Sequence, residues 1–226
     1  MAALPKLRGR RPALHPYFCG VDILLGTFSA LFSVVNPFGA MPVFLTLTDG
    51  DSAGRRTRIA LRACFYMTVI LFVFFLTGQY ILNFFGLRIH DLRIAGGIML
   101  FKSALDMLDA KPSSGGGKLD KETVAASQHK PDITFTPLAM PLLSGPGSIA
   151  IAIGLFTEKL RFWDFPLILL AIAAVGVASF FVLSFSVRLT RFMGKAGLAA
   201  LSRVMSFIIL ALGVSFIVSG LKAVFF

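Results

Sequence analysis

Long apolar segments that carry almost no charge are the feature that most restricts how this chain folds. Of its 226 residues, 56% are apolar and 15% are charged, whereas a soluble domain usually carries about 25% charged residues. A helix needs roughly 20 residues to cross the bilayer core, and six segments approach or exceed that length: about 22–48, 61–85, 92–108, 133–157, 165–187 and 204–226. Their apolar residues show no strict alternation, which argues against a membrane barrel. The sequence predicts an all-α integral membrane protein with six transmembrane helices.

A polar segment divides the chain into two halves. Residues 109–132 are rich in Gly, Ser, Lys and Asp, which predicts a flexible linker between a first three-helix repeat at 22–108 and a second at 133–226. Residues 1–21 form a basic, proline-containing N-terminal tail. Because each half holds an odd number of helices, the second repeat is expected to be inverted in the membrane relative to the first.

The basic residues lie between the apolar segments and give the chain a net charge of +11. This distribution is typical of membrane topology signals rather than of nucleic-acid binding. The segments following the first, third and fifth helices, with Lys102 near the end of the third, hold 13 Lys and Arg, against 9 on the opposite side. The richer side is expected to be cytoplasmic, which predicts that both termini are periplasmic.

No catalytic or metal-binding pattern stands out. The two cysteines and three histidines are isolated in the sequence, whereas a metal site needs three or four converging ligands. Hydrolase and metalloprotease motifs are absent from the sequence. We therefore expect no bound metal, no cofactor and no enzymatic activity.

The first apolar segment contains the sequence NPFGAMP at residues 36–42. Pro37 and Pro42 each lack a backbone N–H, Pro37 disfavours helical geometry at Asn36, and Gly39 permits a positive φ. These residues predict a break in the first helix.

The fourth segment contains a second pattern of this kind, LLSGPGSIA. Gly145, Pro146 and Gly147 predict a break between Ser144 and Ser148, and Ser148 is a candidate N-cap for the helix that restarts there. Lipid cannot satisfy the backbone groups that a break exposes, so both breaks must face protein or a water-filled cavity. Corresponding breaks in the two halves are typical of a transporter's binding site near the membrane midplane.

The breaks favour a small, neutral solute. A restarting helix offers N–H groups and partial positive charge to a carboxylate, and a stopping helix offers carbonyls to an ammonium group. Asn36 can contact such a solute, or it can satisfy only local backbone.

Lys102 and Asp106, four residues apart on the third helix, are candidates for coupling to protons or sodium, and the alternative is an interfacial pair. Ser33, Thr46 and Thr136 are assigned mainly to packing.

The two break sequences resemble those of a known family. NPFGAMPVFLTLT resembles the N-P-x-G-x-x-P-x-F-L-x-L-T signature of the MarC family of bacterial inner-membrane proteins, and PLLSGPGSIA resembles its second signature, P-L-L-x-G-P-G-x-I. The resemblance covers about residues 22–226 and implies six helices, a relation to the LysE-type exporter superfamily, and transport of small neutral amino acids. It carries over to the following site positions: Asn36, Pro37, Gly39, Pro42, Gly145, Pro146, Gly147 and Ser148. In the sixth helix, Ser215 departs from the glutamine that the family tends to carry.

The resulting hypothesis is a multi-pass inner-membrane protein that transports Gly, Ala or Ser by alternating access around the two breaks. The alternatives are a passive small-solute channel and a non-transport membrane assembly or stress factor. The expected partners are the bilayer, a small neutral solute and a coupling ion. A homo-oligomer is a further possibility, because the glycine-rich face at Gly96 and Gly97 can pack within or between chains.

Overall fold

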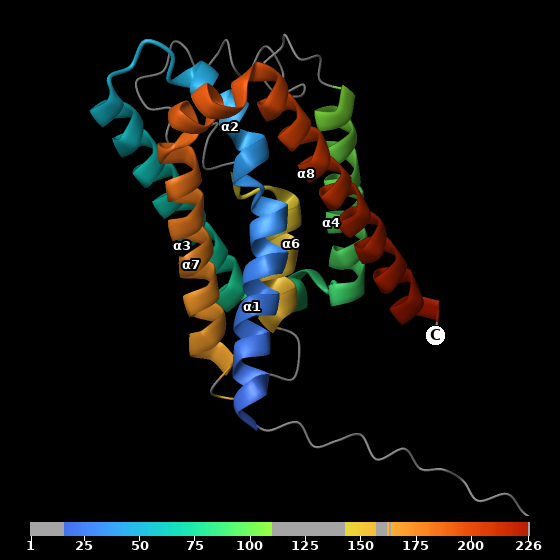
Figure 1. The fold of residues 1–226 in the computed structure, drawn as a ribbon. Coiled ribbons are helices and arrows are strands. Elements are labelled where there is room, and N and C mark those ends of the chain that lie inside the picture. Colours follow the sequence, from blue (N-terminus) through green and yellow to red (C-terminus); the bar gives the residue numbers. More distant parts are fainter. Residues whose placement is uncertain (1–15, 110–142, 157–161, 163, 226) are drawn as a thin grey trace, which may run out of the picture.

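A computed structural model describes residues 16–109, 143–156, 162 and 164–225, and the chain is helical throughout most of these ranges, with no strand in them (Figure 1). The helices are α1 (Pro16–Val35), α2 (Pro37–Leu47), α3 (Ala53–Phe85), α4 (Ile89–Asp109), α6 (Pro146–Phe156), α7 (Asp164–Ser184) and α8 (Ser186–Phe225). The all-α prediction is confirmed. The predicted linker after Asp109 and the first part of the fourth apolar segment, residues 133–142, lie outside the described residues.

Four stretches of the described chain are long and apolar enough to cross a membrane. They are Gly20–Leu47, which joins α1 and α2, then Ala53–Phe85, Asp164–Ser184 and Ala199–Phe225. The apolar helix at Pro146–Leu155 is shorter. Helix α4 has 21 residues but carries charged side chains at both ends, among them Asp91, Arg93 and Asp106. The chain is therefore a multi-pass membrane protein.

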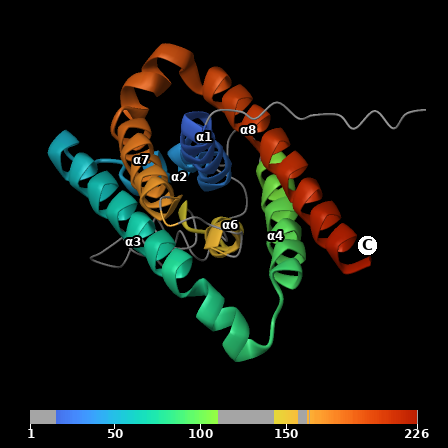
Figure 2. The same ribbon diagram turned by 90° about the horizontal axis from the view of Figure 1, so that it is seen from below.

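The main apolar core lies among α1, α2, α3, α6 and α7. Its fully buried members include Leu31, Phe44, Met67, Phe75 and Ile172. Viewed along the molecule, α1, α2 and α6 lie in the middle, with α3 and α7 on one side and α4 and α8 on the other (Figure 2). A smaller cluster around Leu100, Ala104 and Ile209 joins α4 to α8.

Helices α4 and α8 cross at glycines. A Cβ atom at Gly97 would lie 2.8 Å from the carbonyl oxygen of Gly213, and a Cβ at Gly213 would lie 2.9 Å from that of Gly97. Further along, a Cβ at Gly220 would lie 3.1 Å from the His90 carbonyl oxygen, so the two helices run antiparallel. Small residues let membrane helices approach this closely. Part of the predicted glycine-rich face thus packs within the chain, and we call the pair the α4–α8 arm.

Helix α8 is divided by Gly194, whose backbone is not helical (φ 68°, ψ 175°). This combination of φ and ψ is essentially restricted to glycine. Residues 186–193 therefore form a separate short helix, here called the elbow, between α7 and the apolar part of α8.

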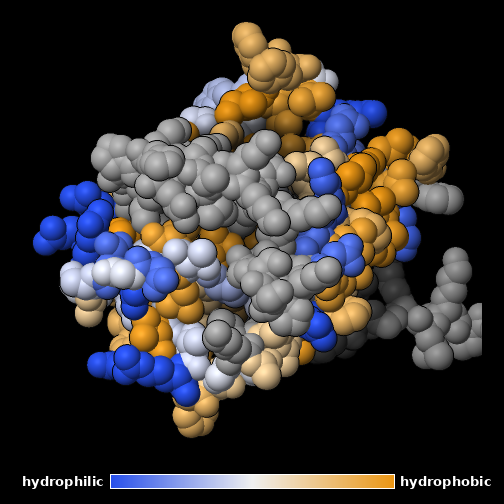
Figure 3. All heavy atoms as spheres, turned by 90° about the horizontal axis from the view of Figure 1, so that it is seen from above, coloured by the Kyte–Doolittle hydropathy of each residue, from blue (hydrophilic) through white to orange (hydrophobic). Residues whose placement is uncertain are grey.

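One end of the molecule carries many of the basic residues. The elbow and the start of α3 lie at this end, at the top in Figure 1, and Figure 3 shows hydrophilic side chains grouped at several places around it. Its arginines are Arg55, Arg56, Arg58, Arg62, Arg188 and Arg191. The topology prediction puts these six arginines on the same side of the membrane. In the structure they lie at the same end of the molecule.

Candidate functional site

The first predicted break is confirmed at a single residue, whereas Pro42, which was also expected to break the helix, lies inside α2. Helix α1 ends at Val35 and α2 begins at Pro37, while Asn36 between them is left-handed (φ 45°, ψ 63°). Among the described residues, Asn36 alone has a positive φ without being glycine. Asparagine tolerates this conformation better than most residues. Its Oδ1 accepts a hydrogen bond from the Gly39 N–H at 3.1 Å, so Asn36 is the N-cap of α2.

Gly39 serves the break differently from the prediction. The positive φ lies at Asn36, and Gly39 is helical. A Cβ atom at Gly39 would overlap the Asn36 side-chain amide and the methyl group of Met107. The glycine is therefore required for space, because the capping amide and a side chain from α4 both lie against its Cα.

The second predicted break lies at the edge of the described residues, which resume at Leu143, and α6 begins at Pro146. The Gly145 carbonyl accepts a hydrogen bond from the Ile149 N–H at 3.2 Å and another from the Ser148 hydroxyl at 2.8 Å. An N-cap side chain would instead accept from a backbone N–H. Ser148 is therefore not the N-cap of α6, and its hydroxyl satisfies the carbonyl that precedes the helix.

The two breaks lie at one level of the molecule. Helix α6 contacts α1, and Figure 1 shows α2 rising from the level at which α6 starts downward. We call the residues at both breaks, Asn36 to Gly39 and Ser144 to Ser148, the break site. The N-terminal ends of two half-helices of opposite direction therefore belong to it.

One face of α4 covers both breaks. The Leu100 side chain lies where a Cβ atom at Gly147 would be, and the Met107 methyl group lies where one at Gly39 would be. Residues seven apart share a helix face, and Ala104 between them is fully buried. Sequence reasoning missed Leu100 and Met107. The signal that could have identified this face is the helical spacing of the apolar residues 100, 104 and 107. The charged residues within this stretch of α4 do not fall on this face.

The break site is buried and uncharged. Asn36 is 6% exposed, and Ser144 and Ser148 are each 1% exposed, although Pro146 is exposed. Helical geometry places Lys102 on the side of α4 opposite to Leu100, and Asp106 on the flank of the helix. Lys102 is exposed and Asp106 half-buried. The structure thus joins the two predicted breaks but does not bring the predicted coupling pair to them.

An arginine holds the far end of α2. The Arg56 side chain of α3 donates from Nε to the Thr48 hydroxyl at 3.1 Å and from Nη2 to the Thr48 carbonyl at 2.9 Å. Thr48 is fully buried and caps the last turn of α2. A cation at a helix C-terminus also interacts favourably with the helix dipole. Half-helix α2 is therefore fixed at one end by Asn36 and at the other by Arg56.

Arg56→Gln is expected to lower the free energy of unfolding by about 1 kcal/mol, because charge-assisted hydrogen bonds to a buried group are lost from a partly exposed donor. The measurement is thermal unfolding of the purified protein in detergent. Arg58→Gln is the matched control, since Arg58 is exposed on the same turn of α3. Equal melting temperatures for the two variants would contradict the capping role of Arg56.

Comparison with known proteins identifies the family. The model of the MarC family integral membrane proteins matches residues 21–225. The UPF0056 membrane protein YvbG of Bacillus subtilis is 35% identical over 204 residues, which cover 90% of this chain and 96% of YvbG. The UPF0056 membrane protein MJ1677 of Methanocaldococcus jannaschii is 37% identical over 196 residues, covering 86% of this chain and 94% of the relative. The UPF0056 membrane protein YhcE of Escherichia coli is 32% identical over 198 residues, which cover 88% of this chain and 91% of YhcE.

No solved structure matches the chain. The family match covers both breaks, the whole of the α4–α8 arm and all of the helices between them, so it includes every residue of the break site. The resemblance predicted from the two break sequences is confirmed. This chain belongs to the MarC family of integral membrane proteins.

Proposed function

We propose that this protein is a secondary transporter of a small neutral solute, with Gly, Ala and Ser as the best candidates, and that the solute binds at the break site. The observation that carries the proposal is that one face of α4 covers both the buried interruption at Asn36 and the start of α6. Interrupted helices at corresponding places in two halves are typical of transporter binding sites.

The chemistry of the break site suits a zwitterion. The N-terminal ends of α2 and α6 offer partial positive charge to a carboxylate. Pro37 cannot donate to the Ser33 carbonyl four residues earlier, so that carbonyl is a candidate acceptor for an ammonium group. The Asn36 Nδ2 donates to the Met107 sulfur at 3.8 Å, and a thioether is a weak acceptor. A carboxylate oxygen would be a better partner for this amide.

The packing suggests which part moves. Leu100 and Met107, which cover the two breaks, both belong to the α4–α8 arm. The arm has its own small apolar cluster, and the main core lies among the other helices. We propose that displacement of the arm exposes the break site, and that it does so alternately to the two sides of the membrane.

Helix pairing supports two inverted repeats. Helices α2 and α6 have 11 residues each. Helix α3 packs on α6 as α7 packs on α2, and α4 packs on α6 as α8 packs on α2. The reciprocal contact of Gly97 with Gly213 is what a two-fold axis in the membrane plane would produce. We therefore retain six helices for the whole chain, in a bacterial inner membrane with both termini periplasmic.

Uptake of labelled Gly, Ala and Ser into proteoliposomes tests the proposal. A transporter should saturate, and excess unlabelled solute inside the vesicles should accelerate entry of label by counterflow. Uptake that rises linearly with concentration and shows no counterflow would indicate a channel. Absence of protein-dependent uptake for all three solutes, with and without proton or sodium gradients, would overturn the transport proposal.

Asp106→Asn tests the proposed coupling role of Asp106 and Lys102. Because both residues lie off the face of α4 that covers the break site, we expect the variant to retain counterflow but to lose accumulation driven by an ion gradient. Ser103→Ala is the matched control, since Ser103 is an exposed neighbour on α4. Gradient-driven accumulation at the wild-type level in Asp106→Asn would assign the pair to the membrane interface instead.

A further inference from the structure

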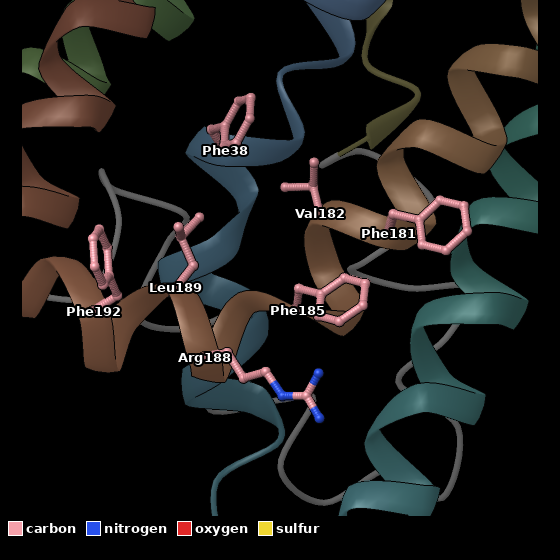
Figure 4. A pocket seen from close by; sticks show the side chains of 7 residues that line it. All are labelled: Phe38, Phe181, Val182, Phe185, Arg188, Leu189 and Phe192. Atoms are coloured by element: carbon pink, nitrogen blue, oxygen red, sulfur yellow. The ribbon is translucent and has the colours of Figure 1, made fainter.

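A hollow beside the break site lies between the start of α2 and the elbow, and Phe38 belongs to both the hollow and the break site. It has a volume of about 440 Å³ and is lined by Phe38, Phe181, Val182, Phe185, Arg188, Leu189 and Phe192. Figure 4 shows that the side chains of α7 and the elbow surround it, with Phe38 of α2 and Arg188 at opposite ends of the view. Six lining residues are thus apolar, and one carries a positive charge.

Arg188 is available to an anion. Its guanidinium carbon lies 5.4 Å from the centre of the Phe185 ring, and no ion pair joins it to a carboxylate of the described residues. Stacking on an aromatic ring orients a guanidinium group but leaves its N–H donors free for a planar or tetrahedral anion. Arginine recognises carboxylate and phosphate groups through paired, charge-assisted hydrogen bonds.

The elbow has the character of a helix at the membrane surface. It alternates Arg188 and Arg191 with the apolar Leu189 and Phe192, and Phe192 is 90% exposed. Amphipathic helices with basic and aromatic residues lie at the boundary between head groups and acyl chains. Arg188 is then at head-group depth. Phe38, in the first turn of α2, is at the other end of the hollow.

We propose that this hollow binds one anionic phospholipid, with its phosphate on Arg188 and one acyl chain along Leu189 and Val182 toward Phe38. Charge complementarity selects the anionic head group, and the apolar lining accepts the acyl chain. Because Phe38 belongs to α2, the bound lipid fastens this half-helix to the elbow. The hollow shares only Phe38 with the break site, and binding of the lipid does not depend on transport activity.

Native mass spectrometry of the full chain in detergent tests the proposal by counting bound lipids. Phosphatidylglycerol and phosphatidylcholine with identical acyl chains are the probes. We expect one tightly bound phosphatidylglycerol and no comparable phosphatidylcholine. Arg188→Gln should weaken the binding of phosphatidylglycerol about fivefold, the factor that one basic residue contributes at an anionic surface. Equal binding of the two lipids would overturn the proposal.

The control variant is Arg191→Gln, which removes the same charge one turn further along the elbow and outside the hollow. This variant should bind one phosphatidylglycerol as tightly as the wild type does. Equal losses in the two arginine variants would indicate diffuse attraction to the basic end and would overturn the site. Arg188→Lys should recover part of the binding lost in Arg188→Gln.

Leu189→Trp tests the acyl-chain part of the site with Arg188 intact. The larger side chain should fill the hollow and displace the lipid, and wild-type binding in this variant would contradict the proposed path of the chain. Glycerol phosphate, added alone, should neither bind at comparable concentration nor compete with phosphatidylglycerol. Competition by glycerol phosphate would show that the site recognises free phosphate rather than a lipid.

Discussion

Gly97→Ala and Gly213→Ala should each sharply reduce the yield of folded protein and lower its thermal unfolding temperature. The added methyl group would lie 2.8 to 2.9 Å from a backbone carbonyl oxygen of the facing helix. A backbone cannot rotate away as a side chain can, so α4 and α8 must separate. We expect a loss of about 2 kcal/mol or more for each variant, at the upper end of typical overpacking costs.

Gly26→Ala is the matched control for these variants. Gly26 is a helical glycine of α1, and a Cβ atom there would meet nothing within 4 Å. Alanine favours helix over glycine by up to about 1 kcal/mol, so this variant should unfold at the wild-type temperature or above. If Gly97→Ala and Gly26→Ala behaved alike, close packing of the α4–α8 arm would be contradicted.

Asn36→Ala should abolish uptake and destabilise the protein, because alanine loses the cap of α2 and adopts a left-handed conformation poorly. The cap contributes about 1 kcal/mol, and the conformation costs alanine a further 1 to 2 kcal/mol, approximately. Thermal unfolding and solute uptake are measured on the same preparation. A loss of uptake in this variant alone would not separate solute binding from folding.

Asn36→Gly makes that separation. Glycine accepts the left-handed conformation and is itself a fair N-cap, so we expect near-normal unfolding but a roughly tenfold higher KM, the factor that corresponds to one lost hydrogen bond to solute. Asn83→Ala is the control amide, exposed on α3 and bonded to Gln79. Wild-type KM in Asn36→Gly would restrict Asn36 to a structural role.

The position of the first break could be predicted from sequence because proline and glycine act locally. Pro37 removes an N–H and restricts Asn36, and these effects need no knowledge of the neighbouring helices. The same reasoning assigned the positive φ to Gly39, although it lies at Asn36. Local rules predicted the interruption but could not determine which residue would adopt the unusual conformation.

The positions of Leu100 and Met107 over the two breaks could not be predicted, because they depend on tertiary packing. Nothing in the sequence near Met107 indicates that its methyl group lies against Gly39, 68 positions earlier. Likewise Arg56 was counted only as a topology signal, whereas it bonds to Thr48 at the end of α2. Long side chains such as these find their partners through the helix arrangement, and apolar spacing alone does not identify the partner.

The helix pairing has a consequence for how the protein is made. Among the described helices, the extensive contacts of α1, α2, α3 and α4 are with α6, α7 and α8 rather than with one another. When the first half leaves the ribosome, the helices on which it packs have not yet been synthesised. Its tertiary structure can therefore form only after the second half has been made. Two fragments separated within residues 110–132 should each be degraded when synthesised alone and should accumulate when synthesised together. Detection of both fragments in membranes by epitope tags would measure this mutual dependence, and a stable first fragment on its own would contradict it.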